Sequence, residues 1–196
     1  MKTLAHTRTL TATFTAIVIT LVIGATGCTK VPLDGPQFNE DGYRFSEINT
    51  VTPDFVPGGE TVSARQLKQM LDKGEPIGLV DVLPTPPRPP ELSPDTLWIP
   101  QRHDNIPGSV WLPGVGLAEM SPALETYFRK GLARATKNNT AVPVVIYCRE
   151  HCWWSWNAAM RTASWGYKVY WFPGGVEEWA AAGYSMVQAH PEPTPP

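Results

Sequence analysis

A short apolar run that ends directly in a cysteine constrains this 196-residue chain more than any other feature. The run, at residues 143–147, is rich in β-branched and aromatic residues and predicts a strand buried on both faces. Behind it, Trp156, Ala159, Met160 and Ala163 recur at helical spacing and predict a helix. A strand that delivers Cys148 to a loop in front of a helix suits thiolate chemistry, because loop N–H groups and the helix dipole stabilise the anion.

Strand and helix signals alternate along the rest of the chain. The segments predicted as further strands are 77–82, 106–113 and 168–172. The segments predicted as further helices run from Ser63 to Lys73, from Ser121 to about residue 136, and from 176 to 182. Residues 83–108 are rich in proline, show neither period, and predict a long irregular loop. This alternation predicts an α/β three-layer sandwich with a mainly parallel central sheet.

The first 27 residues have the pattern of an export signal. Lys2 and Arg8 precede an apolar stretch, which ends in Ala-Thr-Gly immediately before Cys28. A cysteine in this position resembles the lipobox of bacterial lipoproteins, in which it becomes the acylated first residue. We therefore expect a periplasmic protein held at a membrane by a lipid anchor on Cys28. A single uncleaved membrane anchor is the alternative, and the apolar stretch is short for that role.

The remaining chain has the length of one domain. Residues 28–60 show no sustained period and predict a tether, residues 61–189 predict the domain, and residues 190–196 predict a polar, proline-rich tail. Loss of the two basic residues of the signal changes the formal net charge from −2 to −4. Because no basic patch is visible, nucleic acid is not expected as a partner.

Four motifs occur in the order and at the spacing of a known family. They are Asp81 after a strand, Ile-Pro-Gly-Ser at 106–109, Tyr-Cys-Arg at 147–149 and Gly-Gly-Val-Glu-Glu-Trp at 174–179. They resemble the rhodanese domain over about residues 63–184. More narrowly, Cys152-Trp153 with Ser-Trp-Asn-Ala-Ala at 155–159 is similar to the rhodanese-like proteins called PQQ-dependent catabolism-associated CXXCW-motif proteins.

This resemblance implies a role for the loop and a setting for the protein. It implies that Cys148 is the nucleophile, with no cofactor beyond a persulfide on Cys148. It also implies a setting in periplasmic alcohol oxidation by pyrroloquinoline quinone (PQQ) enzymes, with a PQQ-dependent dehydrogenase or a cytochrome as the partner. An active rhodanese loop closes with an arginine that binds the donor anion. Here that end carries Trp153 and Trp154, which argues against thiosulfate turnover.

Several residues in and near the loop are candidates for catalysis or for substrate binding. We expect sulfur transfer or thiol–disulfide exchange, in which Cys148 attacks and Cys152 resolves the intermediate. We also expect His151 to favour a cysteine thiolate, with Arg149 as a nearby cation. The residues expected to bind substrate are Trp153, Trp154 and Arg161. If Cys28 is lipidated, one cysteine pair remains, and whether its sulfur atoms meet depends on how the loop curls.

Two alternatives from other classes stay open. Cys148, His151 and Cys152 offer soft ligands for Cu(I) or Zn(II), with His103 as a distant fourth ligand, although we expect no metal. The chain is otherwise a non-catalytic accessory module, in which a disulfide only braces the loop.

Overall fold

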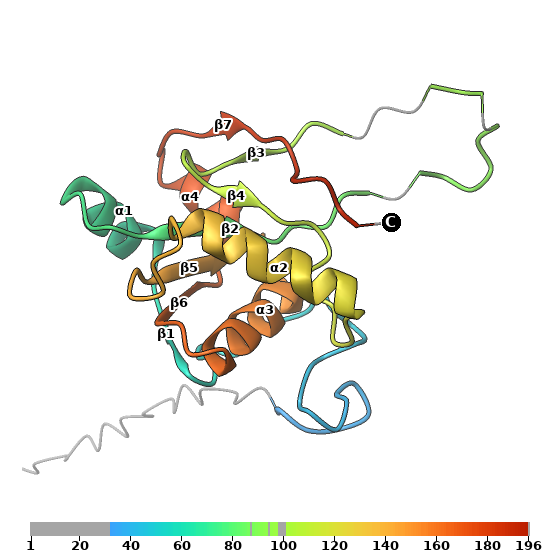
Figure 1. Ribbon diagram of the computed structural model, residues 1–196, viewed down its shortest axis with the longest axis horizontal. Coiled ribbons are helices and arrows are strands. Elements are labelled where there is room, and N and C mark those ends of the chain that lie inside the picture. The colour runs from blue at the N-terminus through green and yellow to red at the C-terminus, as the bar shows by residue number, and fades with distance from the viewer. Residues whose placement is uncertain (1–31, 87, 94, 98–100, 196) are drawn as a thin grey trace, which may run out of the picture.

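The computed structural model describes residues 32–86, 88–93, 95–97 and 101–195. The signal and Cys28 lie outside these residues. Five parallel strands form the central sheet, in the spatial order β1 (Gly59–Thr61), β6 (Val169–Phe172), β5 (Val144–Tyr147), β2 (Gly78–Asp81) and β4 (Val110–Trp111). The predicted α/β fold with a mainly parallel sheet is confirmed (Figure 1).

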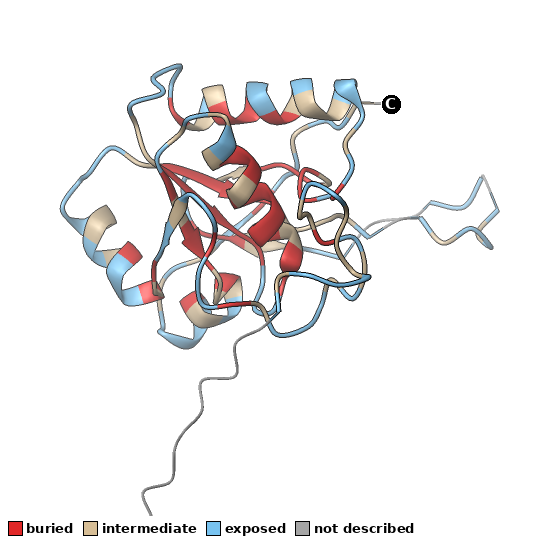
Figure 2. Ribbon diagram, turned by 90° about the horizontal axis from the view of Figure 1, so that it is seen from below, coloured by how far each residue is buried: buried red, intermediate tan, exposed pale blue. Residues whose placement is uncertain are grey.

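Helices cover both faces of the sheet. Helices α1 (Ala64–Asp72) and α4 (Gly175–Ala181) lie on one face, and α2 (Pro122–Ala135) and α3 (Trp153–Ser164) lie on the other (Figure 1). Alternate residues of β5 point to opposite faces: Val144 and Ile146 pack with α2 and α3, whereas Val145 and Tyr147 pack with α1 and α4. All four are buried (Figure 2), which explains the uninterrupted apolar run.

The predicted helix starts are confirmed by their caps. Ser63 and Gln66 form a reciprocal capping box at α1, and the Ser121 hydroxyl accepts from the Leu124 N–H at α2, where Pro122 occupies the first helical turn. These interactions satisfy N–H groups that have no partner within the helix, so they fix where each helix begins. Among the described residues, no helix has the length and apolar character needed to cross a membrane.

A two-stranded sheet was missed by the sequence analysis. Strand β3 (Asp104–Asn105) lies within the segment expected to be an irregular loop, and it pairs antiparallel with β7 (Val187–Gln188). Each of these strands has two residues, which is too short to show the alternation of apolar and polar side chains that predicts a strand. The chain end continues past β7 to the edge of the main sheet, where the Glu192 N–H donates to the Trp111 carbonyl at 2.9 Å. This contact covers part of the exposed edge of β4.

The segment before β1 packs on α3. We call residues 32–58 the lead-in segment; the boundary expected after residue 60 falls inside β1. The buried Asn157 of α3 accepts from the Arg44 N–H at 3.0 Å and donates to the Arg44 carbonyl at 2.8 Å. Its amide also donates to the Gly116 carbonyl at 2.9 Å, ahead of α2. One side chain thus joins the lead-in segment to the domain.

We predict that Asn157→Ala lowers the free energy of unfolding by about 3 kcal/mol, because three buried backbone groups lose their partner. Urea unfolding of the mature protein measures this loss. Asn139→Ala is the matched control: its side chain bonds the Ala141 N–H at an exposed turn, so the change should stay below about 1 kcal/mol. A loss of similar size in both variants would contradict the role given to Asn157.

Candidate functional site

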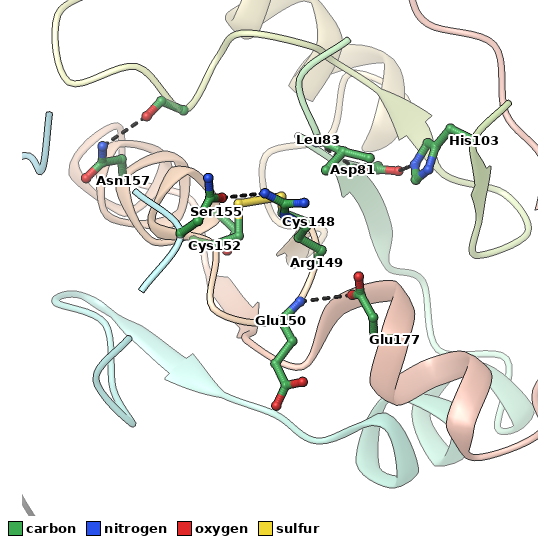
Figure 3. Close-up of a disulfide and its surroundings, with 12 residues drawn as sticks. Asp81, Leu83, His103, Cys148, Arg149, Glu150, Cys152, Ser155, Asn157 and Glu177 are labelled. Atoms are coloured by element: carbon green, nitrogen blue, oxygen red, sulfur yellow. Dashed lines mark hydrogen bonds and ion pairs between the residues drawn. A yellow bond between two sulfur atoms is a disulfide. The ribbon is translucent and has the colours of Figure 1, made fainter. Parts of the chain in front are cut away.

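The cysteine loop lies at the carboxyl end of β5, where the chain turns into α3 (Figure 3). Cys148 and Cys152 form a disulfide across it, with Cα atoms 6.3 Å apart. His151, at the turn, has a positive φ of 55°, which curls the loop back on itself. Both cysteines are buried, and Cys152 caps α3 without a side-chain hydrogen bond. The curl therefore brings together two sulfur atoms that a regular helix would keep apart.

The start of α4 supports one side of the loop. The Val176 N–H donates to the Cys148 carbonyl at 3.1 Å, and Glu177 Oε2 accepts from the Glu150 N–H at 2.9 Å (Figure 3). Gly175 makes this approach feasible: its φ is +54°, and a Cβ there would lie 2.4 Å from the Cys148 carbonyl oxygen. This explains why the first residue of α4 is a glycine.

The lead-in segment supports the other side. The Ile48 carbonyl accepts from the Trp153 N–H at 2.9 Å, and the Thr50 hydroxyl accepts from the Trp153 indole at 3.2 Å. Asn49 Oδ1 accepts from Arg149 Nη2 at 2.6 Å. Consequently the first N–H of α3, a group that would otherwise be available to an anion, is already bonded within the chain.

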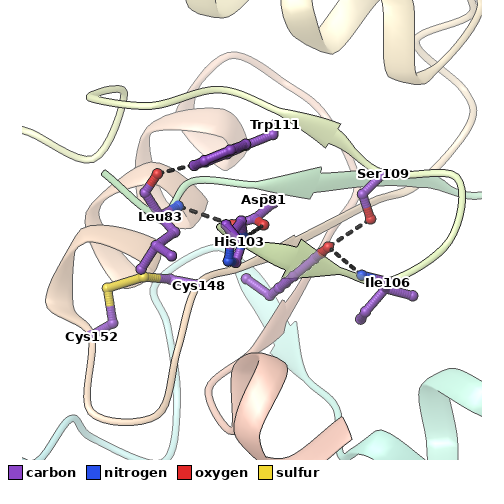
Figure 4. Close-up of polar contacts among 9 residues, drawn as sticks. Asp81, Leu83, His103, Ile106, Ser109, Trp111, Cys148 and Cys152 are labelled. Carbon is purple, nitrogen blue, oxygen red and sulfur yellow. Dashed lines mark hydrogen bonds and ion pairs between the residues drawn. A yellow bond between two sulfur atoms is a disulfide. The ribbon is translucent and has the colours of Figure 1, made fainter. Parts of the chain in front are cut away.

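A buried polar pair lies beside the disulfide (Figure 4). Asp81 Oδ2 is 2.5 Å from His103 Nε2, and Asp81 Oδ1 accepts from the Leu83 N–H at 2.9 Å. Burial raises the pKa of the Asp81 carboxyl, and the hydrogen bond from His103 offsets part of that rise. The Trp111 indole donates to the Leu83 carbonyl at 2.6 Å. Leu83 is thus fixed at both backbone groups; its side chain points toward Cys148 (Figure 4) and packs on the core that contains both cysteines.

The Ile-Pro-Gly-Ser motif at residues 106–109 contacts the last residue of β5. Its Ile106 N–H donates to the Tyr147 hydroxyl at 3.2 Å, and the Ser109 hydroxyl lies 2.6 Å from that oxygen. Burial raises the pKa of Tyr147 well above its usual range, so the phenol stays neutral. The strand residue before Cys148 is therefore held by the loop that precedes β4.

The residues predicted to bind substrate separate into two groups. Trp154 is partly buried near the loop, but Trp153 is fully buried against Phe38 and Trp156, so it offers no open aromatic face. Arg161, also expected to bind substrate, lies away from the loop. It lies two turns along α3, donates to the Leu117 and Ala118 carbonyls, and stacks on Tyr43. The sequence could not show which face of α3 each side chain takes.

The two histidines considered as metal ligands, His151 and His103, lie in different surroundings. The His151 side chain is half exposed, 3.7 Å from Glu150. Within the described part of the chain, no three His, Cys, Asp or Glu side chains are grouped to hold a metal ion. His103 was expected only as a distant metal ligand, and its pairing with Asp81 was not predicted. An acid at the carboxyl end of a buried strand was the one available signal.

The comparisons with known proteins concern most of the chain. The family model for the rhodanese-like domain matches residues 63–182. Similar solved structures include the BH2092 protein of Bacillus halodurans (21% identity, TM-score 0.43, 66% of this chain and 77% of that one). A second is thiosulfate sulfurtransferase from Pseudomonas aeruginosa (14% identity, TM-score 0.44, 68% of this chain and 21% of that one). A third is an uncharacterized protein from Saccharomyces cerevisiae (20% identity, TM-score 0.38, 63% of this chain and 92% of that one). No curated protein matches the chain.

We predict that Leu83→Ala speeds reduction of the disulfide by dithiothreitol about tenfold, because thiol–disulfide exchange depends on access to the sulfur. The rate is followed by quenching with an alkylating agent and mass spectrometry. Leu97→Ala is the control, since Leu97 lies in the same proline-rich segment with 83% of its surface exposed. Equal rates in wild type and Leu83→Ala would mean that Leu83 does not limit access.

Proposed function

This chain belongs to the rhodanese-like domain family, and we propose that it carries out thiol–disulfide exchange through Cys148 and Cys152. The disulfide across the loop is the observation that carries this proposal. When the reduced protein is oxidised, a thiolate on Cys148 attacks a substrate disulfide and releases one substrate thiolate. Cys152 then attacks the mixed disulfide and releases the second, so two electrons pass from the protein to the substrate.

Two features favour exchange over sulfur transfer. A persulfide on Cys148 would be attacked by the thiolate of Cys152, which would form the internal disulfide and expel hydrosulfide. The loop backbone itself also offers little to a donor anion such as thiosulfate. The Trp153 N–H is bonded to Ile48, one donor of Arg149 is bonded to Asn49, and residues 150–154 contain no second arginine. Release of the sulfur as hydrosulfide is therefore faster than its transfer in this proposal.

We predict different outcomes for the two cysteine variants. Cys152→Ser should trap a stable mixed disulfide on Cys148, whereas Cys148→Ser should form none at a comparable rate. The reason is the rhodanese pattern, in which the cysteine directly after the central strand is the nucleophile; here that residue is Cys148 after β5, whereas Cys152 precedes α3. Intact-protein mass spectrometry after reaction with an excess of a small disulfide measures both adducts. Faster trapping on Cys152 would reverse the roles.

We also propose a setting for this chemistry. The similarity to the CXXCW-motif proteins supports a role beside PQQ-dependent alcohol oxidation, with a periplasmic dehydrogenase or cytochrome as partner. The signal pattern supports export and a lipid on Cys28.

We predict that the processed protein leaves membranes with detergent but not with high salt, because buried acyl chains are not screened by ions. Fractionation followed by mass spectrometry of the N-terminal peptide measures this. Cys28→Ser should give a soluble protein or an unprocessed precursor. A processed N-terminus elsewhere, without lipid, would contradict the anchor.

A non-catalytic accessory module is the second candidate. It is favoured by three exposed apolar side chains of the lead-in segment close to the loop: Phe45 (55% exposed), Val51 (61%) and Phe55 (49%). Such a module would bind its dehydrogenase partner with both cysteines replaced by serine. Loss of function in that double variant, with binding retained, separates the enzyme from the module.

A further inference from the structure

A cavity of about 400 Å³ lies beside the disulfide, between the base of the proline-rich loop and the start of α3. This volume suits a small organic molecule and is too small for a protein domain. Neither cysteine lines the cavity, but three lining residues connect it to the cysteine loop: Arg149 follows Cys148, Trp154 lies two residues beyond Cys152, and Leu83 packs on the core that contains both cysteines. A ligand in the cavity therefore borders the cysteine loop.

The charged side chains that line the cavity are all cationic. Arg102 and Arg149 lie there, and no Asp or Glu is among the lining residues. Within the described part of the chain, the Arg102 side chain bonds only Asp104 and the Arg149 side chain only Asn49, so each guanidinium keeps further N–H donors for a ligand. The nearest buried carboxyl, Asp81, is fully covered and faces His103. The cavity thus favours an anion.

The walls of the cavity are apolar and rigid. Trp111 is fixed by its indole bond to Leu83, and its ring lies 4.6 Å from the ring of His103. Pro84 and Trp154 add further apolar surface. Flat, fixed rings of this kind favour a planar apolar group, while guanidinium groups favour carboxylates through paired hydrogen bonds.

We propose that this cavity binds the exchange substrate, a small organic thiol or its disulfide that combines a planar apolar group with a carboxylate. The assignment of this ligand as substrate rests on the proposed exchange function. With such a disulfide, the reduced protein forms a mixed disulfide and releases one thiolate; the second cysteine then releases the other thiolate and closes the internal disulfide. Two electrons move to the substrate, and the two cysteine protons go to solvent.

Binding of an unreactive probe tests the cavity without any exchange chemistry. Calorimetry compares 2-naphthoate with the uncharged 2-naphthamide on the oxidised mature protein. We expect naphthoate to bind about tenfold more tightly, and Arg149→Gln and Arg102→Gln each to weaken naphthoate about threefold while leaving naphthamide unchanged. Arg65→Gln, an exposed arginine of α1, is the matched control and should change neither. Equal affinities for the two probes, or no naphthoate binding at millimolar concentration, would overturn the proposal.

Exchange rates separate this proposal from the function on which it rests. The reduced protein is mixed with 5,5′-dithiobis(2-nitrobenzoate) or with the uncharged 4,4′-dithiodipyridine, and free cysteine is the reference. We expect the protein to prefer the carboxylate disulfide more than free cysteine does, and to lose this preference in Arg149→Gln. Naphthoate binding without fast exchange would overturn the exchange function alone. Fast exchange with the preference of free cysteine would overturn the substrate class alone.

Discussion

The cysteine loop is held by hydrogen bonds that do not involve its sulfur atoms. On one side, the Ile48 carbonyl binds the first N–H of α3; on the other, the Val176 N–H binds the Cys148 carbonyl. These contacts join backbone groups of separate segments, so they do not depend on the S–S bond. In the proposed exchange function, these contacts hold the loop in place while its disulfide opens and closes, which is what a reversible redox pair requires.

The same arrangement leaves fewer groups of the loop free to bind an anion. In a parallel sheet, the carboxyl ends of β5 and β2 meet at one edge, and helix N-termini near that edge attract anions. Here the lead-in segment occupies the first N–H of α3 and one donor of Arg149. The remaining positive charge lies to the side, where Arg102 and Arg149 border the cavity. In the proposal made above, the loop supplies the two sulfur atoms and the neighbouring cavity binds the charged ligand.

The sequence predicted the frame of the fold better than the details of the site. Runs such as residues 144–147 and caps such as Ser63 act locally, so they were visible without tertiary contacts. The pairing of β3 with β7 was not, because it joins segments about 80 residues apart through two residues each. The sequence could not show where the Arg161 side chain points, nor distinguish the buried Trp153 from Trp154, because the direction of each side chain depends on packing against neighbouring segments. The disulfide stayed open because it required the left-handed turn at His151.

An equilibrium redox titration tests the central claim most directly. The mature protein is equilibrated in buffers of graded dithiol or glutathione potential, trapped with an alkylating agent, and scored by mass for the Cys148–Cys152 bond. If the pair is an exchange centre, its midpoint should lie between about −270 and −120 mV, the range of proteins that exchange thiols and disulfides. A midpoint below about −300 mV would identify a structural brace and contradict the account.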